Sequence, residues 1–272
     1  MISDPTPSLR ELLAFYVEAG VDCALMDEPV NRLSDETTPA PVAEKPVHAP
    51  LLRASEMPKP AIRADVAPAP DVAIAAAREA AATAPDLAAL RALMEGFEGC
   101  ALKATATQMV FADGNPQAKI MLVGEAPGRD EDIEGLPFVG RSGKLLNLML
   151  AAIGLDRTKV YIANVIPWRP PGNRTPTPQE TQTCLPFIRR QIELVNPDVL
   201  VTLGNPSTQT LFATSEGIMK TRGRWRDYET GTRTIKALAT FHPAYLLRQP
   251  SSKRLAWLDL RSIAEAVKAF AG

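Results

Sequence analysis

The sequence has few cysteines and no long apolar run. Its 272 residues include three cysteines, Cys23, Cys100 and Cys184, which are too few and too scattered for a disulfide framework or a CxxC metal site. No stretch reaches the ~18 consecutive apolar residues of a membrane span, and the N-terminus lacks the basic-then-apolar order of a signal peptide. We therefore expect reduced thiols, no membrane partner and a cytoplasmic location.

Charge is distributed unevenly along the chain. Residues 1–95 hold 8 Lys or Arg and 15 Asp or Glu, whereas residues 96–272 hold 22 and 16. A modest basic excess is a weak indication of a polyanionic partner such as nucleic acid, because many solvated surfaces carry as much. The 46% hydrophobic and 22% charged residues are typical of a folded globular protein.

The N-terminal third divides into three predicted segments. Within residues 1–27, apolar side chains at helical spacing over 7–25 predict a short helix. Residues 28–70 contain nine prolines, which favours a disordered, semi-extended linker. The alanine-rich run 71–95, interrupted at Pro85, predicts two short helices.

The remainder, residues 96–272, alternates strand-like and helix-like blocks. Strands are predicted at 119–123, 160–165, 198–204 and 235–241, with helices at 142–153, 178–195, 205–212 and 253–269. This alternation predicts an α/β fold, a three-layer α/β/α sandwich with a central, mainly parallel, four-stranded sheet. Ligands of such sheets bind beyond the carboxyl ends of the strands.

Unusual residues occur at those strand ends. The segment Gly124–Gly128 follows the first strand, Asn164 lies in the second, and His242, the one histidine of residues 96–272, follows the fourth. An imidazole there can reach a ligand and change charge near neutral pH. Phe138, between Pro137 and a Val-Gly pair, could stack on a base, although a single phenylalanine more often packs in a core.

Two leucines after the histidine are open to two interpretations. Exposed on a loop, Leu246 and Leu247 would be apolar wedges that enter a DNA duplex. Buried, they would be ordinary core residues.

Six segments in order carry a family resemblance: GEAPGRDED, GLPFVGRSG, VYIANV, RPPGNRTPTPQE, NPDVLVTLG and TFHPAYLLR. Residues 96–272 resemble the uracil-DNA glycosylase superfamily, and within it the bacterial and archaeal family 4 enzymes. The resemblance implies an enzyme that hydrolyses the N-glycosidic bond of uracil flipped out of DNA and so initiates base excision repair. Uracil-containing DNA is then the expected partner.

The resemblance also implies roles for individual residues. Phe138 would stack on the uracil, Asn164 would read its N3–H and O4, and His242 would hydrogen-bond its O2 as negative charge develops. The loop residues that would approach the substrate are Gly124, Ala126, Pro127 and Gly128. The expected DNA contacts are Arg141, Ser142, Arg169, Tyr245, Leu246, Leu247 and Arg248.

The residue that positions the water is left open. Several relatives in the superfamily carry Asp or Asn where this chain has Ala126, which cannot activate a water. Glu125 and Glu131 are the remaining candidates. Glu131 and Asp132 could equally be solvated carboxylates or a helix cap.

A second departure concerns a cofactor. Family 4 enzymes resemble one another in holding a 4Fe-4S cluster with four cysteines, and the corresponding positions here are Phe97, Cys100, Trp168 and Cys184. Because Phe and Trp cannot ligate iron, we expect no cluster and no other cofactor. Phe97 and Trp168 would instead fill the cluster's volume by apolar burial.

Two alternative functions are considered. Ala126 and the missing cysteines are compatible with a non-catalytic uracil-DNA-binding or replication accessory protein. A glycosylase of broader range, acting on other deaminated bases, is the other alternative. We expect a monomer; a repair or replication partner at Leu12, Leu13 and Tyr16 is conceivable, as is a linker without any partner.

Overall fold

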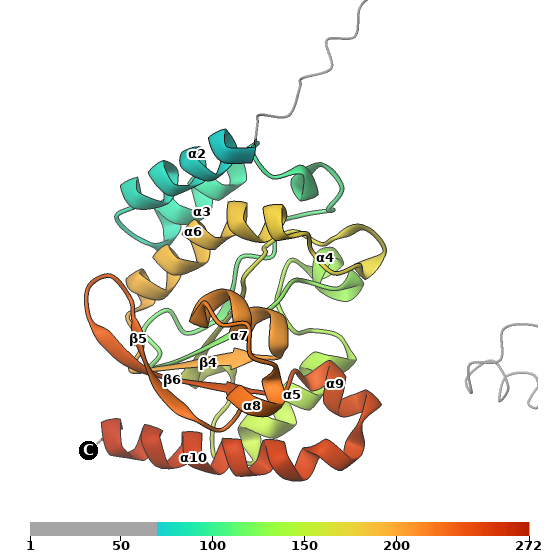
Figure 1. Ribbon diagram of the computed structural model, residues 1–272, viewed down its shortest axis with the longest axis vertical. Coiled ribbons are helices and arrows are strands. Elements are labelled where there is room, and N and C mark those ends of the chain that lie inside the picture. The colour runs from blue at the N-terminus through green and yellow to red at the C-terminus, as the bar shows by residue number, and fades with distance from the viewer. Residues whose placement is uncertain (1–69, 272) are drawn as a thin grey trace, which may run out of the picture. The chain divides into compact units, whose positions relative to one another are not determined.

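The computed structural model describes residues 70–271 (Figure 1). The predictions for residues 1–27 and for the linker up to residue 69 lie outside the described part. The alanine-rich run forms helices α2 (Pro70–Thr83) and α3 (Leu87–Gly96). The break at Pro85 is followed by the N-cap Asp86, whose side chain accepts a hydrogen bond from Ala89 N at 2.8 Å.

A central sheet carries the fold. Its parallel strands are β2 (Ile120–Gly124), β3 (Val160–Asn164), β4 (Val199–Leu203) and β6 (Thr234–Thr240), and the full order is β1-β3-β2-β4-β6-β5. All residues of β2, β3 and β4 are buried, as parallel strands covered on both faces require. The four strands predicted from the sequence are confirmed.

The two edge strands were not predicted. They are β1 (Asp113–Gly114), antiparallel to β3, and β5 (Trp225–Glu229), antiparallel to β6. β1 has only two residues, and β5 reads WRDYE, in which charged side chains conceal the strand pattern although they suit an exposed edge. The sheet therefore has six strands rather than four.

Alternate residues of the strands serve two separate cores. On one face, Met121 and Val123 pack in a cluster with α2, α3 and α6 (Pro178–Val195). On the other face, Ile120 and Leu122 pack with α5 (Arg141–Ala151) and α10 (Lys253–Ala271). Figure 1 shows α6 and α10 on opposite sides of the sheet. The three-layer α/β/α architecture is confirmed.

Helices connect the strands close to their predicted positions. The predicted 178–195 helix is α6, which begins with a capping box between Thr177 and Glu180, and α7 (Asn205–Phe212) follows β4. Three short helices were missed: α4 (Arg129–Glu134), α8 (Ile218–Thr221) and α9 (Pro243–Arg248). None of the helices within residues 70–271 combines the length and the apolar character needed to cross a bilayer.

Candidate active site

A cavity of about 350 Å³ opens beyond the carboxyl ends of β2, β3 and β6. Phe138, Asn164 and His242 all line it, together with the loop residues Glu125 to Gly128. The sequence analysis placed Asn164 and His242 at separate strand ends and Phe138 between Pro137 and a Val-Gly pair, and the fold brings all three side chains to one pocket. The loop that precedes α6 adds five lining residues that we did not predict: Pro170, Asn173, Arg174, Thr175 and Pro176.

Asn164 is held at the cavity wall by the sheet itself. It is the last residue of β3 and lies opposite Gly124 of β2, and Val165 N donates to Gly124 O at 3.0 Å just beyond the ladder. The side chain is 5% exposed, and its Oδ1 is buried without a hydrogen-bond partner among the described residues. Because an unpaired buried acceptor is costly, this oxygen is suited to a ligand that donates a hydrogen bond.

Gly124 leaves room for this amide. A Cβ at position 124 would lie 2.4 Å from Asn164 Oδ1 and 2.7 Å from Phe138 Cζ. Any other residue would displace one of these two groups. The glycine of the GEAPG segment therefore allows the ring and the amide to approach each other closely.

Phe138 has a backbone conformation that is uncommon for its residue type. Its φ is 57°, and its ring is 4% exposed, with the centroid 5.3 Å from that of His242. A non-glycine residue in this left-handed region costs about 1–2 kcal/mol. The surrounding contacts must therefore hold the loop in place.

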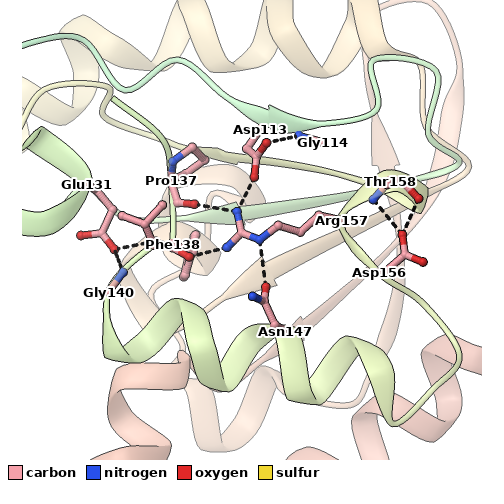
Figure 2. A network of polar contacts seen from close by, with 11 residues as sticks. Asp113, Gly114, Glu131, Pro137, Phe138, Gly140, Asn147, Asp156, Arg157 and Thr158 are labelled. Carbon is pink, nitrogen blue, oxygen red and sulfur yellow. Dashed lines mark hydrogen bonds and ion pairs between the residues drawn. The ribbon is translucent and has the colours of Figure 1, made fainter. Parts of the chain in front are cut away.

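Arg157 supplies those contacts (Figure 2). Its Nη1 donates to Pro137 O at 3.1 Å, and its Nη2 donates to Phe138 O. The guanidinium is in turn held by an ion pair with Asp113 and by Asn147 Oδ1, which accepts from Nε at 2.9 Å. Arg157 was not predicted, because nothing in a lone arginine before a strand reveals that it reaches the carbonyls of residues about twenty positions earlier.

Glu131 is engaged by backbone groups. Its carboxylate accepts hydrogen bonds from Gly128 N at 3.0 Å, Val139 N at 3.1 Å and Gly140 N at 3.2 Å. The side chain is 7% exposed and lies in the first turn of α4. It thereby ties the GEAPG loop to the loop that carries Phe138. Of the alternatives considered, Glu131 is a helix cap, because it accepts from the N-cap residue Gly128. Asp132 instead accepts hydrogen bonds from Thr107 N and Oγ1 at 2.8 and 2.9 Å.

Glu125 lines the same cavity as Glu131 but differs from it in its surroundings. It is half-buried, and burial raises the pKa of its carboxyl group above the ordinary value. A carboxylate with a raised pKa is a better proton acceptor than an unperturbed one. The backbone of Glu125 is fixed, since its carbonyl accepts from Ile166 N at 3.0 Å.

His242 is positioned by the start of α9. It is the N-cap residue, and its Nδ1 accepts a hydrogen bond from Ala244 N at 3.1 Å. Burial, with a smaller contribution from the charge of Arg248, lowers the pKa of His242 to about 4. The imidazole is therefore neutral near pH 7, and because Nδ1 accepts, its proton is on Nε2.

Comparisons with known proteins agree with this geometry. Residues 111–261 match the family model described as the uracil DNA glycosylase superfamily. The chain belongs to the uracil-DNA glycosylase superfamily. It is 43% identical over 170 residues to the "Type-4 uracil-DNA glycosylase" of Archaeoglobus fulgidus, covering 61% of this chain and 85% of the relative. Relatives with the same name from Thermotoga maritima (42% over 173 residues; 62% and 88%) and Sulfurisphaera tokodaii (41% over 171 residues; 61% and 78%) are similar.

A second hollow of about 460 Å³, which we call the basic hollow, lies beside the cavity lined by Phe138, Asn164 and His242. Ser142 and Arg248 line both spaces. Arg129 and Arg141 add positive charge to the hollow, and Asp130 and Glu131 are the opposing charges in its lining. Arg169, an expected DNA contact, lines neither space. Its Nε donates to Asn173 Oδ1 at 2.7 Å, and its Nη1 lies 3.8 Å from Asp132 Oδ2.

The wedge prediction is wrong for Leu246. The segment after His242 is helix α9 rather than a loop, and Leu246 is 1% exposed in the core beneath it. Leu247, one residue on, faces outward with 36% exposure and lines the basic hollow. Tyr245 stacks on Phe241 with ring centroids 5.0 Å apart.

The four positions that the family resemblance assigns to a 4Fe-4S cluster lie in one buried core cluster: Phe97, Cys100, Trp168 and Cys184. Only two of them carry sulfur, and Cys184 Sγ donates to Cys100 Sγ at 3.8 Å. Phe97 packs edge-to-face on Phe187, and Trp168 is 2% exposed. No group of three or more His, Cys, Asp or Glu residues within 70–271 could hold a metal ion. This donor set does not fit a cluster with four thiolates.

Proposed function

We propose that this protein is a uracil-DNA glycosylase that removes uracil from DNA by hydrolysing the N-glycosidic bond. The observation that carries the proposal is the cavity shared by Phe138, Asn164 and His242, in which a buried amide oxygen lacks a partner among the described residues. The relatives named as type-4 uracil-DNA glycosylases support the same reaction.

Recognition of the base follows from the amide of Asn164. Uracil presents an N3–H donor and an O4 acceptor along this edge, which match Oδ1 and the NH₂ group. Cytosine presents an acceptor and a donor in the reverse order. Each buried polar group left unpaired costs about 1–3 kcal/mol, so two mismatches would disfavour binding of cytosine by a factor of at least about 30.

His242 assists the departure of the base. Its Nδ1 already accepts a hydrogen bond from Ala244 N, which leaves Nε2–H as the donor of the ring. A neutral donor near uracil O2 stabilises the negative charge that develops as the bond to the sugar lengthens. The ring of Phe138 is tilted by 31° to the imidazole, with the two ring centroids 5.3 Å apart, and bounds the same pocket.

The geometry favours Glu125 over Glu131 as the residue that positions the water. Both carboxylates line the cavity, but only Glu125 has a pKa that burial raises, and this supports the role. Glu131 uses its carboxylate to accept three backbone hydrogen bonds, so we assign it the positioning of the two loops.

The basic hollow is suited to the DNA backbone. Arg141, Arg248 and Ser142 support phosphate binding there, and the exposed Leu247 is the one of the two leucines available to enter the duplex. We propose that the enzyme acts as a monomer; size-exclusion chromatography with light scattering would test this.

We further propose that the protein works without an iron-sulfur cluster, because two of the four ligand positions carry aromatic rings. Protein purified anaerobically should be colourless and contain no stoichiometric iron. A brown preparation with iron bound in a fixed ratio would contradict the proposal.

The function itself is tested with a labelled oligonucleotide that contains a single uracil. After incubation, alkali cleaves abasic sites, so strand scission indicates glycosylase activity. The Asn164→Ala variant is the matched negative control. Retention of the oligonucleotide without scission by the unmodified protein would instead support the non-catalytic binding protein.

A further inference from the structure

Two thiols are in direct contact at the positions that the family resemblance assigns to a cluster. Cys100 Sγ and Cys184 Sγ are 3.8 Å apart, and both residues are buried, with 4% and 0% exposure. Neither lines the base cavity. The contact thus has no part in the proposed glycosylase reaction, and it joins segments 84 positions apart in the chain.

The two cysteines lie in backbone of different conformation. Cys184 lies within the long helix α6 and is fully buried. Cys100 lies in extended backbone, with φ −112° and ψ 115°, directly before the short 3-10 helix at Ala101–Ala104. A disulfide requires sulfur atoms about 2.05 Å apart, so the segment of Cys100 has to close the remaining distance by a side-chain rotation and a small shift.

We propose that Cys100 and Cys184 are a redox modification site, in which hydrogen peroxide or a related peroxide converts the thiol pair into a reversible disulfide. The disulfide would link the segment after α3 to helix α6. The family resemblance assigns cluster ligands to both of these segments. Phe97 and Trp168 fill the adjoining core, so that the two sulfur atoms have each other as partners.

The reaction balances as follows. The thiolate of Cys100 attacks one oxygen of the peroxide, which forms a sulfenic acid at Cys100 and releases the other oxygen as water after protonation. The sulfur of Cys184 then attacks the sulfenic sulfur, and the leaving hydroxide takes the proton of Cys184 to form a second water. In total, two thiols lose two electrons and two protons, and one hydrogen peroxide becomes two waters; an organic peroxide would give one alcohol and one water.

Burial determines which thiol reacts first. Cys100 is the less buried of the two, with 4% exposure against 0% for Cys184, so a peroxide reaches its sulfur first. Cys184 is then the resolving residue.

The test uses the full chain with Cys23→Ser, which removes the third thiol. The folded, reduced protein is treated with hydrogen peroxide, denatured, alkylated with iodoacetamide and analysed by mass spectrometry. We expect an unalkylated product about 2 Da lighter, a linked pair of peptides containing Cys100 and Cys184, and restoration of two alkylation sites by dithiothreitol. Closing a loop of this length should also raise the Tm reversibly by about 10 °C.

Single replacements provide the controls. With Cys100→Ser or Cys184→Ser added, peroxide should cause neither the mass loss nor the rise in Tm. Two alkylated thiols after peroxide treatment, or sulfinic and sulfonic acids in place of the linked peptides, would overturn the proposal. Stoichiometric iron on the untreated protein would overturn it as well. Cleavage of uracil DNA is not a readout, so the outcome is independent of the glycosylase proposal.

Discussion

Replacement of Arg157 should impair uracil excision although Arg157 does not line the cavity. Its guanidinium donates to the carbonyl oxygens of Pro137 and Phe138 and so holds Phe138 at a φ of 57°. In Arg157→Ala both hydrogen bonds disappear. The loop can then relax toward an ordinary conformation and carry the ring away from the base.

The expected magnitude follows from the backbone strain. Relaxation of a left-handed non-glycine residue releases about 1–2 kcal/mol. If that free energy now favours the relaxed loop, the fraction of enzyme with the ring in place falls by about 5- to 30-fold. The single-turnover rate at saturating enzyme should fall by the same factor. Arg157→Lys, which retains a donor for one carbonyl, should recover part of it.

A double-mutant cycle separates positioning from general destabilisation. If Arg157 acts through the ring, the Arg157→Ala and Phe138→Ala variants should be non-additive, and the double variant should be no slower than Phe138→Ala alone. Asp113→Asn, which removes the ion-pair partner and leaves the carbonyl contacts, should have a smaller effect. Strictly additive losses, or a lowered Tm with an unchanged cleavage rate, would refute the reasoning.

Three further predictions concern the cavity. Gly124→Ala should slow excision by about 100-fold, because the new Cβ would lie 2.4 Å from Asn164 Oδ1. The control Gly217→Ala should leave the rate unchanged, since the space around Gly217 is open. Equal rates for the two variants in a cleavage assay would contradict the prediction. Glu125→Gln should slow excision at least about tenfold near pH 7.5 and abolish the acid limb of the pH–rate profile. In the unmodified protein this limb should lie above the ordinary carboxyl pKa, because burial raises the pKa of Glu125. If the variant retains the limb, Glu125 does not position the water. His242→Ala should slow excision about 10²- to 10³-fold. This loss should be the same at every pH from about 6 to about 8, because a pKa of about 4 keeps the imidazole neutral over that range. A loss that grows toward acid pH would instead indicate a charged imidazole.

Much of this architecture could be predicted from the sequence because its strongest signals are local. The apolar runs of β2, β3 and β4 are buried on both faces, so each run is recognisable without knowing its neighbours. Glu125 follows β2, Asn164 ends β3 and His242 lies just after β6, and the parallel sheet brings these carboxyl ends together.

The features that were missed depend on contacts between distant segments. Strand β5 is defined by pairing with β6, not by its own mixed sequence. Leu246 is buried because α9 turns that side of the helix toward the core, and a pair of adjacent leucines does not reveal which one faces inward. Arg157 reaches carbonyl groups about twenty residues away, and backbone acceptors have no sequence signature.

The central claim is that one cavity surrounds the extruded base, and a crystal structure of the protein soaked with free uracil tests it most directly. We predict the ring against Phe138, its N3–H donating to Asn164 Oδ1, and its O2 facing His242 Nε2. Uracil bound elsewhere, or in this cavity with Asn164 Oδ1 still unpaired, would contradict the account.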